Sequence, residues 1–404
     1  MKTGISLEEA IELIVQNITP LGTEPVSLFQ LLGRTPAFPI AAPINNPPFD
    51  RSPLDGYALR SVDTKGATQQ APVKLTVVDT VYAGDVPCVP LKEGQAIKIM
   101  TGAMLPPGCD CVLMQERTDM GCPTVSIYKE MQPRENYCRR GEDFKFGTLL
   151  LPAGVKADAV AVGVLASAGV TDNIPVFRRP SVAVLCTGNE IVLPGVGDNK
   201  LPFGKIYDSN AHLIAARLCE LGFPNARIEW AQDDAQTVCD VMRRLVGEYD
   251  VIITTGGVSV GEKDIMPDAL ALLNAESIFH RVNMKPGTPA LFSKYEDVPI
   301  LSLSGNPFAA AATFELLARP LLAAMTEEHW LFLQQVEAVM QTAFEKPSAG
   351  RRLIRGHCEE GKVYIPGEHS SSVLSTMLGC NCLIDIPAGS GPVPAGETVQ
   401  ILLL

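Results

Sequence analysis

The feature that most constrains the fold is an alternation of apolar runs and amphipathic segments between Val182 and Met325. Residues 182–186 have the composition of a buried strand, and residues 211–221 carry apolar side chains at helical spacing before Gly222. The same alternation continues with predicted strands at 226–230, 251–255, 278–283 and 300–303 and helices at 236–246, 265–274 and 307–325. This pattern predicts a layered α/β domain.

The flanking regions have a different pattern, and 404 residues exceed what one hydrophobic core usually supports. Residues 70–150 alternate short apolar runs with Gly and Pro, which predicts a small β-rich domain, and the C-terminal region returns to this pattern. Near the N-terminus, Ser6-Leu7-Glu8-Glu9 is a capping box that begins a helix. The proline-rich stretch from Pro36 to Pro53 is expected to cross between domains.

Charge and cysteine content narrow the class of protein. The chain has 33 Lys and Arg against 45 Asp and Glu, without basic runs, which argues against nucleic acid and acidic membranes as partners. We find no uninterrupted apolar run near the roughly 18 residues that span a bilayer, and no signal-peptide pattern. The eleven cysteines contain no C-x-x-C pair and are expected to be mostly reduced. A cytoplasmic location is expected.

The carboxyl ends of the predicted strands carry the candidate ligand-binding loops, because open α/β sheets bind ligands there. Residues 254–264 follow one strand and precede a helix start at Ile265. The glycines and a hydroxyl of this loop are Gly256, Gly257, Ser259 and Gly261. Such a turn lets backbone N–H groups surround a phosphate, with the helix dipole assisting. A plain turn between strand and helix is the alternative.

Three carboxylates are expected at the ends of different strands: Glu190, Asp233 (or Asp234) and Asp264. Oxygen ligands beside a phosphate site favour Mg²⁺, which usually takes one or two carboxylates and shares phosphate oxygens of the substrate. The alternative for Asp234 is a helix cap, and for any one carboxylate a solvated surface position.

Positive charge follows the strand predicted at 278–283, where Lys285 and, four residues earlier, Arg281 suit an oxyanion. A solvated turn lysine is the alternative. Asn306 and Pro307 form a good helix start, so capping is expected there. The chain lacks both a Ser-His-Asp order and a P-loop signature, which disfavours acyl transfer and P-loop ATP hydrolysis.

Seven motifs in order span nearly the whole chain and together are far more specific than one loop. They are Asp50-Arg51-Ser52-Pro53-Leu54-Asp55-Gly56-Tyr57-Ala58, Thr101-Gly102-Ala103 with Leu105-Pro106, Gly141-Glu142-Asp143, Thr187-Gly188-Asn189-Glu190, Gly256-Gly257-Val258-Ser259-Val260-Gly261, Lys285-Pro286-Gly287 and Gly305-Asn306-Pro307. This set resembles the molybdopterin molybdenumtransferase family, which is related to the C-terminal domain of gephyrin.

The resemblance implies a multidomain α/β plus β fold. A central three-layer α/β domain, similar to molybdopterin adenylyltransferases, would be accompanied by two smaller β-rich domains and a helical linking domain. The implied bounds are 1–44 with 144–177 for the discontinuous linking domain, 45–143 for the first β-rich domain, 178–326 for the molybdopterin-binding domain and 327–404 for the C-terminal β domain. An elongated homodimer is implied as well.

The resemblance also implies a reaction in which adenylylated molybdopterin and molybdate give molybdenum cofactor and AMP, with Mg²⁺ or a similar divalent cation. It implies a transient contact with the molybdopterin adenylyltransferase. Two other functions stay open: a non-catalytic pterin-binding scaffold and a molybdopterin adenylyltransferase. The sequence does not separate molybdate from tungstate as the substrate.

The family's functional positions carry over residue by residue. The implied catalytic residues are Asp55, Thr101, Asp143, Glu190, Asp233, Asp264 and Lys285, with Glu190, Asp233 and Asp264 as metal ligands. The implied substrate-binding residues are Gly256, Gly257, Ser259, Gly261, Arg281, Asn306, Arg355 and Ser371. The chain departs from the family pattern at Asn189, where Asp is usual, and at Arg281, Thr288 and Ser304, where Lys, Lys and Pro are usual.

Overall fold

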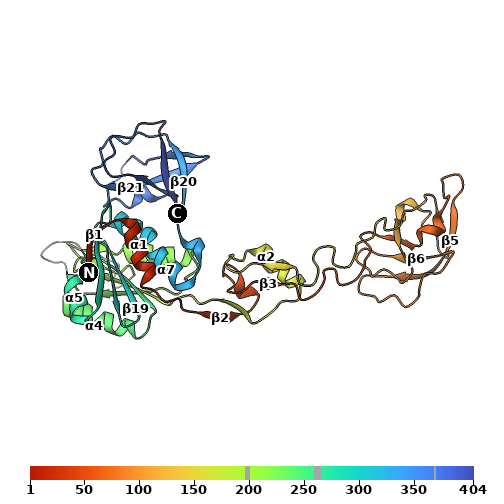
Figure 1. Cartoon of the computed structure of the whole chain (residues 1–404), viewed down its shortest axis with the longest axis horizontal. Helices are drawn as coiled ribbons and strands as arrows, with labels where there is room; N and C mark the ends of the chain where they lie inside the picture. The colour runs from red at the N-terminus through yellow and green to blue at the C-terminus, as the bar shows by residue number, and fades with distance from the viewer. Residues whose placement is uncertain (196–200, 259–264, 368–369) are drawn as a thin grey trace. The chain divides into compact units, whose positions relative to one another are not determined.

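The computed structural model describes residues 1–195, 201–258, 265–367 and 370–404, and the chain divides into two compact units. The first unit combines Met1–Glu24 with Val176–Leu404, and the second is Pro25–Pro175 (Figure 1). All eleven cysteines are free thiols, as expected.

A seven-stranded sheet forms the centre of the first unit. Its strands, in spatial order, are β1 (Lys2–Ile5), β16 (Glu276–Val282), β18 (Leu291–Tyr295), β19 (Val298–Leu303), β15 (Val251–Thr255), β11 (Val182–Thr187) and β14 (Arg227–Ala231). The last four run parallel, whereas β18 is antiparallel to both neighbours. Every residue of β11 and β15 is buried, as expected for strands covered on both faces.

Helices cover both faces of this sheet, so the predicted layered α/β domain is confirmed. They are α1 (Leu7–Gln16), α3 (Asn210–Glu220), α4 (Ala235–Val246), α5 (Ile265–Leu273), α6 (Pro307–Thr313), the π-helical turn Phe314–Ala318 and α7 (Arg319–Thr326). Alternate residues of β11 enter opposite cores: Val184 packs with α1, α3 and the α6–α7 helix, and Leu185 packs with α4 and α5.

Residues 1–24 fold with the α/β sheet, whereas the resemblance implied a linking domain at 1–44 and 144–177. Strand β1 pairs in parallel with β16, with Ile5 opposite Val282. Helix α1 starts at the predicted cap, where the Glu9 N–H donates to Ser6 Oγ at 3.1 Å, and its apolar face joins the core. Pairing between such distant segments leaves no local pattern in the sequence.

A six-stranded sheet completes the first unit and confirms the predicted β-rich C-terminal region. Its strands, in spatial order, are β17 (Met284–Lys285), β21 (Arg351–Glu359), β22 (Lys362–Tyr364), β20 (Gln334–Met340), β24 (Thr398–Leu403) and β23 (Cys382–Ile386). Short 3₁₀ helices lie at His329–Leu331 and Ser375–Met377. The short pair β12 (Ile191–Val192) and β13 (Ile206–Tyr207) follows β11.

The second unit is built on a five-stranded sheet, which confirms the predicted β-rich region. Its strands, in spatial order, are β7 (Cys111–Met114), β4 (Gly56–Leu59), β6 (Gln95–Ile99), β5 (Val73–Val81) and β8 (Thr124–Ile127). The other elements of the chain are the pairs β2 (Thr23–Val26) with β10 (Ile174–Phe177), whose residues are divided between the two units, and β3 (Ile40–Ala41) with β9 (Leu149–Leu151), the helix α2 (Ala159–Ser167), and 3₁₀ turns at Phe29–Leu31, Ser61–Thr64 and Gln115–Arg117. A helical linking domain is not evident, because short strand pairs occupy much of the expected segment.

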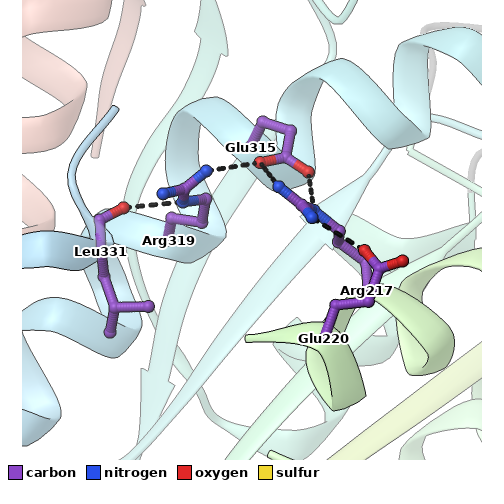
Figure 2. A network of polar contacts seen from close by, with 5 residues as sticks. All are labelled: Arg217, Glu220, Glu315, Arg319 and Leu331. Atoms are coloured by element: carbon purple, nitrogen blue, oxygen red, sulfur yellow. Dashed lines mark hydrogen bonds and ion pairs between the residues drawn. The ribbon is translucent and has the colours of Figure 1, made fainter. Parts of the chain in front are cut away.

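The continuous helix Pro307–Thr326 is long and apolar enough to cross a membrane, but 94% of its apolar window is buried inside the protein. It is therefore a core helix. Its interior carries charge: Glu315, 5% exposed, accepts hydrogen bonds from Arg217 Nε at 2.6 Å and from Arg319 Nη1 at 3.0 Å (Figure 2). Arg319 Nε donates in turn to the Leu331 carbonyl. The carboxylate thus joins α3 to the π-helical turn in the core.

We expect Glu315→Ala to lower the free energy of unfolding by about 3–5 kcal/mol, because it leaves a buried guanidinium without its counter-charge. Denaturant titration of the purified protein measures this change. Glu220→Ala is the matched control, since Glu220 also pairs with Arg217 but its side chain is 66% exposed. A comparable loss in both variants would contradict the buried-charge explanation.

Candidate active site

A cavity of about 940 Å³ lies at the carboxyl ends of β11, β15 and β19. Its wall is assembled from segments far apart in the sequence. They are Cys186–Gly188 with Glu190 and Ile191, Ile206–Asn210, Asp233, Thr255–Val258, Lys285–Pro289, Ser304–Pro307 with Ala309, and Ser371–Ser372. All of these segments belong to the first unit.

The glycine turn after β15 packs directly against the turn after β11. Gly256 has φ +99°, and a Cβ there would lie 2.6 Å from the Thr187 carbonyl oxygen. An ideal Cβ on Gly305, in the turn after β19, would lie 3.4 Å from the Gly256 Cα, which is a close van der Waals contact. Gly257 has φ +64° and also lines the cavity. The predicted residues Ser259, Gly261 and Asp264 lie outside the described residues.

Asn210 links two of these turns and was not predicted as a site residue. Its amide nitrogen donates to Thr255 Oγ1 at 3.1 Å and to the Gly305 carbonyl at 2.8 Å. Asp208, on the same wall, caps α3 by accepting the His212 N–H and also contacts His212 Nδ1. The sequence carries a signal at this place, because Asp208-Ser209-Asn210 stands between a strand and a helix, but such a pattern by itself indicates only a helix cap.

Two of the three predicted metal ligands, Glu190 and Asp233, line the cavity. The Asp233 N–H donates to Asn189 Oδ1 at 3.2 Å, so the residue that replaces the usual Asp ties the two loops together. Asp234 instead caps α4, and the Thr237 N–H that it accepts lowers the pKa of its carboxyl. In the described ranges no group of three or more His, Cys, Asp or Glu side chains could hold a metal ion. Two carboxylates on a polar cavity nonetheless suit Mg²⁺, which often takes only one or two.

The two predicted cations differ in whether they line the cavity, and the predicted side-chain cap at Asn306 does not form. Lys285 is exposed and lines the cavity, whereas Arg281 is exposed on β16 and lies outside the lining. Asn306 lines the cavity at the N-cap position of α6, but its side chain makes no capping hydrogen bond, contrary to expectation. Pro307 occupies the first turn, as predicted.

Two predicted residues come from the C-terminal sheet region. Ser371 lines the cavity. Arg355 is 0% exposed and is absent from the lining. Its guanidinium donates to the carbonyl oxygens of Ser370 and Val373, so it lies behind the wall and contacts the backbone that carries Ser371.

The second unit holds Asp55, Thr101 and Asp143. Asp55 Oδ1 accepts hydrogen bonds from the Thr101 N–H and from Thr101 Oγ1, each at 2.7 Å. These two donors lower the pKa of the Asp55 carboxyl, the backbone N–H most strongly. Asp143 Oδ2 accepts from Asn46 Nδ2 at 3.0 Å. The structure thus pairs Asp55 with Thr101, whereas Asp143 is hydrogen-bonded to Asn46.

Comparison with known proteins identifies the class. Residues 183–324, which include the parallel strands and most of the cavity wall, match the family model described as a probable molybdopterin binding domain. Fold and site together define a molybdopterin-binding protein. Residues 5–169 match the MoeA N-terminal region (domain I and II), and residues 337–404 match the MoeA C-terminal region (domain IV).

Full-length relatives specify the family. The molybdopterin molybdenumtransferase of Staphylococcus aureus (strain COL) is 34% identical over 406 aligned positions, covering 100% of this chain and 96% of the relative. The crystal structure titled molybdopterin biosynthesis moea protein from Pyrococcus horikosii has a TM-score of 0.85 and 30% identity, covering 99% of both chains. The chain belongs to the MoeA family of molybdopterin molybdenumtransferases, which are transferases. This result decides against the adenylyltransferase and scaffold alternatives.

We expect Thr101→Val to raise the pKa of the Asp55 carboxyl, because one of its two donors is lost. The folded pKa of Asp55 is depressed, so this contact stabilises the fold at neutral pH and is lost as pH falls through that lowered pKa. Carboxyl NMR titration measures the shift. Asp119, whose pKa is lowered by the Ser126 N–H, is the internal control. An Asp55 titration that stays in place would contradict the assigned cause.

Proposed function

We propose that this transferase inserts molybdate into adenylylated molybdopterin and releases AMP, with Mg²⁺ bound at the strand-end cavity. The observation that carries the proposal is that a tight glycine turn, two carboxylates and an exposed lysine line one cavity. A glycine turn at a strand end suits a phosphate group, and a lysine suits an oxyanion. Adenylylated molybdopterin carries the phosphate groups, and molybdate is the oxyanion.

The roles of the residues follow from their positions. Glu190 and Asp233, with Asp264, would hold Mg²⁺, which supplies positive charge to the phosphate oxygens of the substrate. The glycine turn at Gly256 and Gly257 lets the same phosphates approach the backbone closely. The Lys285 ammonium attracts molybdate and offsets negative charge near the reacting group. No protein nucleophile is needed, because positioning and electrostatics carry the reaction.

Further substrate contacts are proposed for Asn306 and Ser371, which line the cavity. Ser259 and Gly261, which lie outside the described residues, are proposed as substrate-binding residues because they match functional positions of the family. Arg281 and Arg355 would contribute positive charge from outside the lining. Residues 45–143 and 327–404 are proposed as separate β domains around a molybdopterin-binding domain at 178–326. We place the enzyme in the cytoplasm, with a transient contact to the molybdopterin adenylyltransferase.

We expect AMP release from adenylylated molybdopterin only when both molybdate and a divalent cation are present. Lys285→Ala should lower this rate by about a hundredfold, as expected for loss of one oriented electrostatic contact. The measurement is AMP formation with and without chelator, molybdate and tungstate. Lys294→Ala is the control, since Lys294 lies on β18 and does not line this cavity. Unchanged AMP release with chelator would rule out the metal role.

We also propose that the enzyme is a homodimer in which Asp55, Thr101 and Asp143 face the cavity of the partner subunit. Support comes from α2, whose sequence is apolar on all sides. Leu165 is its one buried residue, and Val160 is 71% exposed. Phe146 in the same unit is equally exposed. A helix that is apolar all round is normally buried, so a second copy is expected to cover it.

We expect Val160→Glu to convert the dimer to a monomer at micromolar concentration. In a two-fold interface each subunit would bury one new carboxylate without a counter-charge. Light scattering coupled to gel filtration measures the mass. Val62→Glu is the control, since Val62 is 61% exposed in the same unit but lies in the Ser61–Thr64 turn. A wild-type monomer with full turnover would refute the dimer.

A further inference from the structure

One part of the cavity wall is supplied by a turn outside the seven-stranded sheet. Ser371 and Ser372 line the cavity, yet they follow β22 of the C-terminal sheet. The other lining residues belong to strand ends, loops and helix starts of the α/β domain. The cavity is therefore complete only when the turn Ser370–Val373 is held against the α/β domain, and the residues that hold it can be identified.

The first contact is made by Arg355 in the middle of β21, where it pairs with Leu383 of β23. Its guanidinium donates to the carbonyl oxygens of Ser370 and Val373, one at each end of the turn. Its Cζ also lies 4.0 Å from the centroid of the Phe308 ring, on helix α6 of the α/β domain. A fully buried guanidinium is costly unless it is hydrogen-bonded, so these carbonyls are necessary partners.

The second contact is made by the backbone of the same Phe308. It lies in the first turn of α6, where N–H groups have no partner within the helix. The Phe308 N–H donates instead to the Ser371 carbonyl at 3.1 Å. The turn is thus held from the C-terminal sheet by Arg355 and from the α/β domain by Phe308, and these two residues are stacked on each other.

We propose that Arg355 is a positioning residue that latches the turn Ser370–Val373 onto the start of α6 and so closes the substrate cavity. It touches no cavity space itself and acts through the backbone of Ser371. A planar guanidinium can donate to two carbonyls and stack on a ring at the same time, whereas a lysine ammonium offers a single point charge. Arg355→Lys keeps the charge but removes the latch.

The test compares Arg355→Lys with Arg352→Lys on the same strand. Arg352 also lies over an aromatic ring, that of Phe344 at 5.5 Å, and its Nε donates to Ser348 Oγ at 3.2 Å. Both of these contacts stay within the C-terminal region, away from the turn. The two substitutions therefore remove interactions of the same kind, from a half-buried arginine at 352 and a fully buried one at 355, and only the second affects the latch.

The first measurement is hydrogen exchange of the Phe308 amide in the full-length protein without substrate. Loss of the charge-assisted hydrogen bonds to the turn should speed exchange at this amide by about tenfold or more in Arg355→Lys. Exchange should be unchanged in Arg352→Lys. An unchanged Phe308 amide in Arg355→Lys would overturn the latch, and so would equal acceleration in both variants.

The second measurement is steady-state turnover, which rests on the proposed function. We expect Arg355→Lys to raise KM for adenylylated molybdopterin by about tenfold with a much smaller change in kcat, because the wall that contacts bound substrate is displaced. Faster exchange with unchanged KM would show that the turn does not serve the cavity. Where the wild type shows no turnover, the proposed function fails, and the exchange experiment still decides the latch.

Phe308→Leu provides a second variant in case Arg355→Lys folds poorly. It keeps an apolar side chain at a buried position but removes the ring on which the guanidinium stacks. Its KM should rise in the same direction, and exchange at residue 308 should again accelerate. Normal values for both quantities in a folded Phe308→Leu would reject the stacking part of the proposal.

Discussion

The close approach of two backbone turns supports the rest of the site. Gly256 lies so near the Thr187 carbonyl that any side chain would have to displace one of the two central strands. Because β11 and β15 are buried along their whole length, neither strand can shift without disturbing both cores. The turns are consequently fixed in positions where they line one cavity together with Glu190 and Asn210.

The helix from Pro307 to Thr326 transmits this rigidity to the lysine loop. Gly287 packs against Thr313 so tightly that a Cβ would lie 2.1 Å from Thr313 Cγ2. Two residues further on, the π-helical turn places Glu315 between Arg217 and Arg319 (Figure 2). A π-helical turn changes the register of the side chains that follow it. The buried charge network therefore holds in place the same helix that begins at the cavity and packs against the lysine loop.

The C-terminal sheet contacts this site in two places. Strand β17 pairs with β21, which places Lys285 opposite Arg352 in the register. Farther along β21, Arg355 reaches the turn that carries Ser371. The same strand thus supports a cation and a hydroxyl of the cavity wall, which gives a physical reason for a third, β-rich region in an enzyme whose substrate loops come from an α/β sheet.

Much of this arrangement was already determined by the sequence. Apolar periodicity predicted β11, β15, α3 and α4 within a residue or two, since local burial and helix caps set those patterns. The motifs predicted the family and the strand-end carboxylates. Tertiary structure alone decided that β1 joins β16, that Asn210 bridges two loops and that Arg355 lies behind the wall. These outcomes depend on contacts between distant segments, and a residue's local neighbours in sequence do not encode which distant backbone groups it will meet.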